Sequence, residues 1–304
     1  MKVFVEDRMK RKMLSSEYSR REFLRALSFG GAAMAVHGFK TFETEKYIPA
    51  IGIQLYTVRK AIAQDFEAAV RKIAETGFVG VETFSLPEQI TLDRAGKVLR
   101  DAGLKVLGCH CNLPVGNDRD VALRMAETYD ADRIVFHGWP PGEKYKNGDE
   151  LKHTVEVYNE ISSALKSQGI KFGLHNHWFE FEKNDESVVP FYYLLKNVNH
   201  DIFFEIDTYW TKTGGQDPVK VIADFGKRAP LLHIKDGAAQ KGPEMHNHVP
   251  AGEGTVDFFG IVKAGGKNIE WMIVEFDEYE HDIFEGVQKS YAYLTKNGLA
   301  KGKV

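Results

Sequence analysis

From residue 51 onward, short apolar runs alternate with amphipathic segments, and no other feature of the sequence limits the fold as strongly. The apolar runs have the length of strands, and the segments between them repeat their apolar residues with helical spacing. We predict strands at residues 51–55, 79–84, 104–108, 132–137, 170–174, 201–207, 231–235 and 271–276. Helices are predicted at residues 65–76, 92–102, 119–129, 150–167, 188–196, 218–225, 257–264 and 284–295. Strands that alternate with helices form parallel sheets, and eight such units in roughly 250 residues fit a closed (β/α)8 TIM barrel.

The main alternative to a closed barrel is an open, doubly wound α/β sheet. That fold usually carries a glycine-rich phosphate-binding turn after its first strand. Here the first strand is followed by Tyr56-Thr57-Val58-Arg59, which contains no glycine. Because no linker, low-complexity tract or block of charge interrupts the pattern, we predict a single barrel over residues 48–297.

The charge and the cysteine content exclude two other classes of protein. A formal net charge of -3 gives no basic footprint for nucleic acid. The two cysteines, Cys109 and Cys111, are separated by one residue, a spacing that disfavours an unstrained disulfide. We therefore expect neither a nucleic-acid-binding protein nor a fold held by disulfides.

Residues 1–38 have the features of an export signal that precedes the fold. A basic start is followed by Ser19-Arg20-Arg21-Glu22-Phe23-Leu24 and then by a weakly apolar stretch rich in Gly and Ala. Paired arginines before a short apolar region are typical of a twin-arginine signal. An amphipathic N-terminal helix is the alternative, which the glycines disfavour. We predict export to the periplasm by the twin-arginine translocase, and no stable membrane span, because the apolar stretch is too short.

Polar side chains follow the fifth to eighth predicted strands at the point where each strand ends. These residues are His175, Asp207, His233 and Glu275. In a barrel of parallel strands the C-terminal strand ends meet at one face, where the chemistry occurs. One such residue alone is commonly a cap or a packing residue, but four successive strands indicate a shared site. A mixed nitrogen and oxygen donor set suits Mn²⁺, Co²⁺, Fe²⁺ or Zn²⁺, so we predict one divalent metal ion.

Several stretches resemble the sugar phosphate isomerase/epimerase family, whose members have the xylose-isomerase-like TIM barrel. The resemblance rests on Gly52-Ile53-Gln54-Leu55-Tyr56-Thr57-Val58-Arg59, Gly80-Val81-Glu82, Leu174-His175-Asn176-His177 with Glu180-Phe181, Leu232-His233-Ile234-Lys235-Asp236 and Val274-Glu275. It implies one divalent metal held by the fifth to eighth strands, usually through Glu, Asp, His and Glu. Asp207, His233 and Glu275 match the last three, whereas His175 stands where many relatives have Glu. Glu180 is the nearest carboxylate in the sequence that can substitute for that Glu.

The resemblance also implies a class of reaction. Isomerisation and epimerisation of sugars remove a proton next to a carbonyl, while the ion polarises that carbonyl and stabilises the enediolate. Glu275 is expected to serve as a ligand and also as the base. His177, Glu180 and Lys235 are candidate second acids or bases, although Lys235 can instead pair with Asp236 or Glu275.

Further residues near the strand ends are candidate carbohydrate contacts. They are Glu82, His110, Trp178, Trp210 and His248, and His137, Trp139 and His246 lie in similar positions with less weight. Glu82 can bind a sugar hydroxyl or orient a ligand, unless it forms a salt bridge with Arg59. The cysteines beside His110 are assigned to packing, because strand alternation turns them to the opposite face. Aromatic faces suit the C–H surfaces of sugars, and His248 lies in a long loop of the kind that is usually functional.

The leading hypothesis is an exported, metal-dependent sugar isomerase or epimerase that acts on a small carbohydrate. A metal-dependent lyase or dehydratase acting on a keto-sugar or 3-keto-glycoside would use the same site and expel a leaving group from the enediolate. Apurinic endonucleases share the barrel, but the acidic balance argues against DNA. A non-catalytic sugar-binding barrel predicts that removing the metal leaves ligand affinity unchanged. No feature of the sequence specifies the substrate or the oligomeric state.

Overall fold

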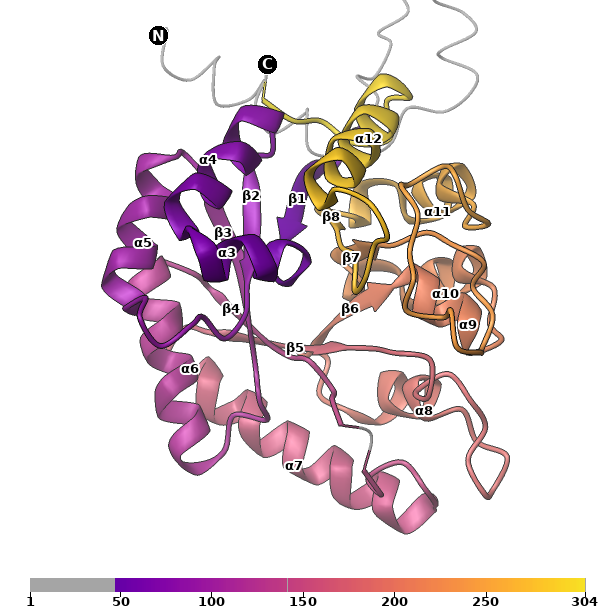
Figure 1. The fold of residues 1–304 in the computed structure, drawn as a ribbon. Helices are drawn as coiled ribbons and strands as arrows, with labels where there is room; N and C mark the ends of the chain where they lie inside the picture. Colours follow the sequence, from indigo (N-terminus) through magenta and orange to yellow (C-terminus); the bar gives the residue numbers. More distant parts are fainter. Residues whose placement is uncertain (1–46, 141, 304) are drawn as a thin grey trace, which may run out of the picture. The chain divides into compact units, whose positions relative to one another are not determined.

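The computed structural model describes residues 47–140 and 142–303, so the predicted export signal at residues 1–38 lies outside the described residues. From Tyr47 onward the chain forms one compact unit. Eight parallel strands close into a barrel in sequence order, with β8 paired to β1 (Figure 1). The strands are β1 (Ala50–Gln54), β2 (Gly80–Thr83), β3 (Lys105–Cys111), β4 (Arg133–Phe136), β5 (Lys171–His175), β6 (Phe203–Asp207), β7 (Leu231–Ile234) and β8 (Trp271–Val274). The predicted (β/α)8 barrel is confirmed, and the open-sheet alternative is wrong.

Helices follow the strands and lie outside the barrel (Figure 1). The α-helices are α3 (Arg59–Gln64), α4 (Phe66–Thr76), α5 (Leu92–Asp101), α6 (Gly116–Tyr129), α7 (Gly148–Lys166), α8 (Pro190–Asn197), α9 (Thr208–Thr213), α10 (Pro218–Phe225), α11 (Phe258–Gly265) and α12 (Ile283–Lys296). The short 3-10 helices are η1 (Leu55–Val58), η2 (Gly226–Arg228) and η3 (Gly266–Asn268). All eight predicted helices are present, whereas η1 and α3 after β1, α9 after β6, and the short helices η2 and η3 were not predicted. Among the described residues, no helix is long and apolar enough to cross a membrane.

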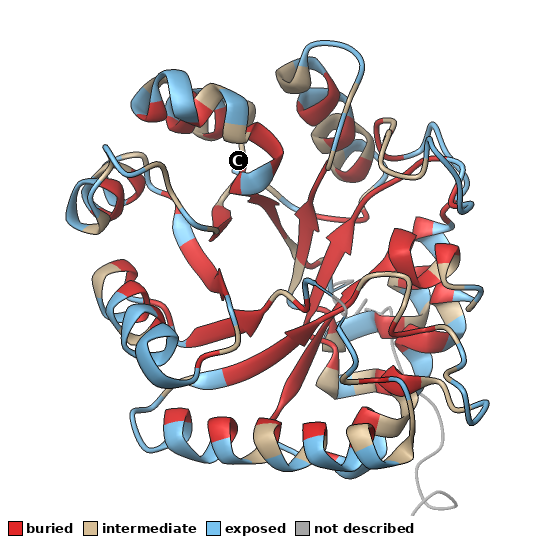
Figure 2. Ribbon diagram, turned by 60° about the horizontal axis from the view of Figure 1, so that its bottom comes forward, coloured by how far each residue is buried: buried red, intermediate tan, exposed pale blue. Residues whose placement is uncertain are grey.

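Local sequence signals explain where the helices begin and end, as α4 illustrates. The Asp65 side chain accepts the Ala68 N–H at 2.9 Å, which caps the first turn. The helix ends at Gly77, whose φ of +110° suits glycine. The residues of α4 that face the barrel are buried, and its other side is exposed, a pattern that the outer helices share (Figure 2).

The interior of the barrel is filled by apolar side chains toward the N-terminal ends of the strands. A separate apolar cluster occupies this region, formed by Leu107, Val135, Phe203, Leu231 and Ile273. Glycine on a neighbouring strand makes room for a large ring, because a Cβ at Gly173 would lie 2.3 Å from Phe203 Cζ. Packing therefore closes this end, and the polar residues gather toward the C-terminal ends.

The pairing of β2 with β3 shifts by one residue, which changes where the side chains of β3 point. Glu82 pairs with Gly108 where a regular register would pair it with Leu107. Such a bulge disrupts the inside–outside alternation along a strand. Leu107 packs inside the barrel, and His110, three residues later, also points inward. The two cysteines that flank His110 are buried in the outer core, as predicted.

Candidate metal centre and active site

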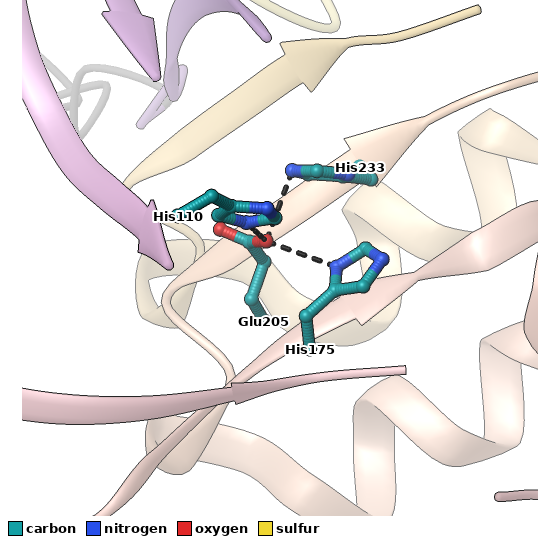
Figure 3. Close-up of side chains that lie close together, drawn as sticks. All are labelled: His110, His175, Glu205 and His233. Atoms are coloured by element: carbon teal, nitrogen blue, oxygen red, sulfur yellow. Dashed lines mark hydrogen bonds and ion pairs between the residues drawn. The ribbon is translucent and has the colours of Figure 1, made fainter. Parts of the chain in front are cut away.

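Glu205 lies at the centre of a buried polar cluster inside the barrel (Figure 3). Its Oε1 atom is 2.7 Å from His110 Nε2, 3.0 Å from His175 Nδ1 and 3.0 Å from His233 Nε2. β3, β5, β6 and β7 each provide one of these four side chains. One possible ligand atom from each lies within 4.8 Å of the others, so this group has the spacing of a metal site.

Asp207, His233 and Glu275 form a second group with the same spacing, which shares His233 with the first group. His233 Nδ1 is 2.5 Å from Glu275 Oε2 and 4.0 Å from Asp207 Oδ2. The Glu205 carboxylate instead approaches the other ring nitrogen, Nε2. The four predicted ligands therefore divide between two groups: three lie together, and His175 lies with Glu205.

The histidines of the first group have different charge states. Burial lowers the pKa of His110, but the Glu82 and Glu205 carboxylates outweigh burial and raise it to about 10. Burial also lowers the pKa of His233, and Glu205 again outweighs it, so that this pKa lies well above its usual value. At His175 burial dominates and lowers the pKa to about 3. Without a metal ion, His110 and His233 are therefore charged at neutral pH and His175 is neutral.

Glu82 belongs to this interior network. Glu82 Oε2 accepts a hydrogen bond from Gln54 Nε2 at 2.9 Å and lies 2.7 Å from His233 Nε2. Arg59 pairs with Glu278 instead, at 2.6 Å. The predicted alternative, a salt bridge between Glu82 and Arg59, is therefore wrong, because η1 carries Arg59 away from the barrel interior.

Lys235 is buried among three carboxylates. Its Nζ is 3.2 Å from Asp207 Oδ2, 3.0 Å from Glu275 Oε2 and 2.9 Å from Asp277 Oδ1. Burial lowers the pKa of Lys235, but Asp207 and the other two carboxylates raise it well above its usual value, so the ammonium group stays charged. The predicted pairing of Lys235 with Glu275 is confirmed. The alternative pairing with Asp236 is wrong, because the Asp236 carboxylate accepts backbone N–H groups from the following loop.

Buried oxygen atoms without hydrogen bonds test whether the site fits a cation. Glu205 Oε2 and Glu82 Oε1 are buried and accept no hydrogen bond, and Asp207 Oδ2 has only its ion pairs, with Lys235 at 3.2 Å and with His233 at 4.0 Å. A buried carboxylate is costly unless it is paired or coordinates a metal. Both groups mix imidazole and carboxylate donors, which suits Mn²⁺, Co²⁺, Fe²⁺ or Zn²⁺. The residues present therefore fit a divalent metal ion.

A cavity of about 570 Å³ opens onto both groups at the C-terminal ends of the strands. Its lining consists of Gln54, Tyr56, Arg59, Phe84, Ser85, His110, His137, Trp139, His175, His177, Lys235, His246, Glu275, Asp277 and Glu278. Of the main predicted site residues, five are among them, namely His110, His175, His177, Lys235 and Glu275, and the candidates of less weight, His137, Trp139 and His246, are there as well. The remaining ones do not line the cavity, namely Glu82, Trp178, Glu180, Asp207, Trp210, His233 and His248.

Glu180 lies behind His177 and away from the cavity. Its Oε2 atom accepts the His177 backbone N–H at 2.8 Å, and its side chain is fully buried. Burial raises the pKa of Glu180 to about 8. The carboxylate that contacts His175 is Glu205, at 3.0 Å. Glu205 is therefore better placed than Glu180 to substitute for the glutamate that many relatives have at position 175.

Comparison with known proteins agrees with this architecture. The model of the xylose isomerase-like TIM barrel family matches residues 70–296. The chain belongs to this family. Among curated protein sequences, none matches the chain.

Solved structures of similar fold cover most of this xylose isomerase-like barrel. A sugar phosphate isomerase/epimerase from Parabacteroides distasonis is 25% identical, with a TM-score of 0.72, over 85% of this chain and 97% of that one. A D-allulose 3-epimerase from Methylomonas sp. is 15% identical, with a TM-score of 0.60, over 83% and 98%. A probable 3-DHS dehydratase from Bacillus anthracis is 16% identical, with a TM-score of 0.65, over 81% and 98%. The fold thus occurs in sugar isomerases and epimerases, and the last two structures share the fold alone.

Two residues of this xylose isomerase-like barrel, Glu205 and Asp277, were not predicted from the sequence. Glu205 lies two residues before Asp207 on β6 and therefore on the same face, so a carboxylate within an otherwise apolar strand was an available signal. Asp277 lies in the loop after β8, where the sequence has no periodic pattern that would predict which way a side chain points. It contacts Lys235 Nζ at 2.9 Å and His246 Nδ1 at 3.1 Å.

Trp178, Trp210 and His248, which were predicted as carbohydrate contacts, do not line the cavity but pack with His246 and Tyr209 next to it. The rings of Trp178 and Trp210 lie 5.1 Å apart between centroids, and His246 lies 5.9 and 5.1 Å from them. His248 is buried with its ring 4.7 Å from Tyr209. Of these residues, His246 lines the cavity.

Proposed function

We propose that the protein is a divalent-metal-dependent sugar isomerase or epimerase that transfers a proton next to a carbonyl through an enediolate. One observation carries the proposal: Glu275 lines the cavity and belongs to the same ligand group as Asp207 and His233. This group lies at the C-terminal face, where catalysis occurs in TIM barrels. A structural relative named as a sugar phosphate isomerase/epimerase supports the same reaction class.

In this proposal Asp207, His233 and Glu275 hold the ion, and the group around Glu205 is the second candidate set. When bound, a divalent ion polarises a substrate carbonyl and stabilises the negative charge that develops on its oxygen. Lys235 lies beside the first set and keeps its positive charge, which offsets the negative charge of Asp207 and Glu275 and helps to position them.

Glu275 and His177 both line the cavity and are the proposed proton carriers. Burial raises the pKa of Glu275, but Lys235 and His233 outweigh burial and lower it well below its usual value. Glu275 is therefore a carboxylate at neutral pH and can accept a proton. Burial lowers the pKa of His177 well below its usual value, so its imidazole is neutral at neutral pH. In the proposed reaction Glu275 removes the proton and His177 exchanges a proton with the substrate from a second position.

Exchange of substrate hydrogen with deuterium from the solvent tests the proposal. The full chain is isolated from its native host, analysed for metal, and incubated in deuterated water with free sugars and 3-keto sugars. Glu275→Gln and His177→Gln are each expected to slow exchange by about 10²–10⁴-fold, the usual contribution of general acid–base catalysis. His233→Ala is expected to lower the metal content.

His153→Ala is the matched control, because His153 is exposed on α7. This variant should keep both the metal and the exchange rate. A protein without metal that exchanges no sugar in the panel would contradict the proposal.

A lyase or dehydratase acting on a keto-sugar or 3-keto-glycoside is the second candidate. The placement of Glu275 and His177 on one cavity supports it, because such a pair can remove a proton and protonate a leaving group. Product analysis separates the two reactions. An isomerase or epimerase returns a product with the atoms of the substrate, whereas a lyase releases the leaving group as a separate molecule.

A further inference from the structure

We propose that the rim of the cavity binds a second, uncharged ring, so that the substrate is a neutral glycoside or oligosaccharide rather than a sugar phosphate. This inference rests on the proposed function and specifies the substrate class of the same site. Three observations carry it: the pairing of the cations in the cavity, the aromatic residues exposed at its rim, and its volume.

Arg59, at the rim, donates three of its five N–H groups to other groups of the protein. Its Nη2 donates to Glu278 Oε1 at 2.6 Å and to the backbone oxygen of Asp277 at 2.7 Å. Its Nη1 donates to the backbone oxygen of Tyr56 at 3.0 Å. Lys60 binds the other oxygen of the Glu278 carboxylate, at 2.8 Å. A phosphate at the guanidinium group would compete with the Glu278 carboxylate, which already pairs with it.

Lys235 is the other permanently charged cation among the described residues that line the cavity, and three carboxylates surround it. Against these two cations the lining carries the carboxylates of Glu275, Asp277 and Glu278. A bound divalent ion would offset charge at the floor, but it would add no positive charge at the rim, where Arg59 is already paired with Glu278. Recognition of phosphate relies on charge-assisted hydrogen bonds from such cations. The lining therefore disfavours a phosphorylated substrate.

Aromatic side chains are exposed on two sides of the rim. Tyr56, after β1, is 38% exposed, and Trp139, after β4, is 47% exposed. The edge of Phe84 packs against Tyr56 with 5.6 Å between ring centroids, and the Arg59 guanidinium carbon lies 4.0 Å from the Tyr56 ring centre. Trp139 is supported by His177, with 5.4 Å between ring centroids. Supported but exposed aromatic rings suit contact with the C–H face of a sugar ring.

The volume of the cavity exceeds what one sugar ring needs. About 570 Å³ lies within the range of ~300–1,000 Å³ that is typical of pockets for drug-sized ligands. Such ligands contain more atoms than a single hexose. A reacting sugar at the floor, near Glu275, would leave room for a second ring near Tyr56 and Trp139.

Calorimetric titration of the metal-loaded full chain with two sets of matched sugars tests the inference. One set is fructose, fructose 6-phosphate and isomaltulose, which differ in the group on O6. The other set is glucose, glucose 6-phosphate and isomaltose. In at least one set we expect the two-ring sugar to bind about tenfold or more tightly than the phosphate, a difference that calorimetry resolves readily. Tighter or equal binding of both phosphates, or no binding of either two-ring sugar, would overturn the inference.

Substitutions at the rim test whether its residues cause the tighter binding of the two-ring sugar. Trp139→Ala and Tyr56→Ala should weaken binding of the two-ring sugar about tenfold and leave binding of the matching single-ring sugar unchanged. Phe259→Ala is the control, because Phe259 is an exposed aromatic residue on α11 that does not line the cavity. Glu278→Gln should release Arg59 and strengthen binding of the phosphate. The proposed rim site would be contradicted if these variants weakened binding of the one-ring and two-ring sugars equally, or if Glu278→Gln did not strengthen binding of the phosphate.

The deuterium experiment separates failure of this inference from failure of the proposed function. Exchange into a sugar phosphate but not into either two-ring sugar would overturn the inference and leave the isomerase or epimerase intact. Binding of a two-ring sugar without deuterium exchange into any sugar would overturn the proposed function, while the inference that the rim binds an uncharged ring would still stand.

Discussion

The Lys235 ammonium group separates three carboxylates that would otherwise repel one another inside the barrel. Its Nζ lies within 3.2 Å of an oxygen of each of the three carboxylates. Breaking a buried ion pair by removing one partner costs about 3–5 kcal/mol, so Lys235→Met should lower the free energy of unfolding of the metal-free protein by that amount. Urea denaturation measures the loss.

Lys220→Met is the control for that experiment. Lys220 forms a pair with Asp224 on α10 and is 67% exposed, so its loss should change stability by about 0–1 kcal/mol. Equal losses in the two variants would show that the pairing of Lys235 does not stabilise the fold.

Glu180 should make stability depend on pH in a direction opposite to that of a surface carboxylate. Burial raises its pKa to about 8, from 4.5. The folded state therefore holds a proton that the unfolded state has lost between these values, and stability falls as the pH rises from about 4.5 to about 8. Glu180→Gln keeps an oxygen for the His177 N–H and should remove this fall. Unfolding free energies between pH 5 and pH 9 would show parallel curves for the two proteins if Glu180 kept an ordinary pKa.

At the scale of elements, Asp236 fixes the long loop after β7. Its carboxylate accepts the backbone N–H groups of Gly252 and Gly254 at 2.9 and 3.0 Å, and those of Gly237 and Val256 at 2.9 and 3.1 Å. This loop carries His246 to the cavity. Asp236→Ala leaves these groups unpaired, and we expect amide hydrogen exchange of the loop to become at least about tenfold faster, because local opening becomes easier.

Asp217→Ala provides the comparison at the same scale. Asp217 caps α10 by accepting the Val219 N–H at 2.9 Å, and its loss should cost about 1 kcal/mol. Exchange should then increase in α10 and stay unchanged in the loop after β7. Unchanged exchange of that loop in Asp236→Ala would mean that other contacts hold it.

At the scale of the whole molecule, we propose that residues 1–38 direct export and are not needed for folding of the barrel, which begins at β1. The proposal rests on the pair Arg20 and Arg21 before a short apolar stretch. Arg20→Lys combined with Arg21→Lys should leave the protein in the cytoplasm with an unchanged unfolding midpoint. Cell fractionation measures this, with Arg8→Lys and Arg11→Lys as controls that should still be exported. Export of the Arg20 and Arg21 variant would contradict the proposal.

The fold class followed from the sequence alone, and the face of the barrel at which the polar residues gather could be predicted from it. Periodicity is a local property, so apolar runs and helical spacing specified the eight units, and parallel strands bring their C-terminal ends to one face. The expectation that His175, Asp207, His233 and Glu275 lie near one another therefore needed no long-range information.

The tertiary structure decided which of these residues share a group. The bulge in β3 turns His110 inward, and barrel closure brings Glu82 from β2 to 2.7 Å from His233 on β7. Glu205 takes the position beside His175 that the sequence suggested for Glu180, because Glu180 turns back to its own loop. These contacts depend on register and on closure across the barrel, and neither is encoded in the spacing of residues along one strand.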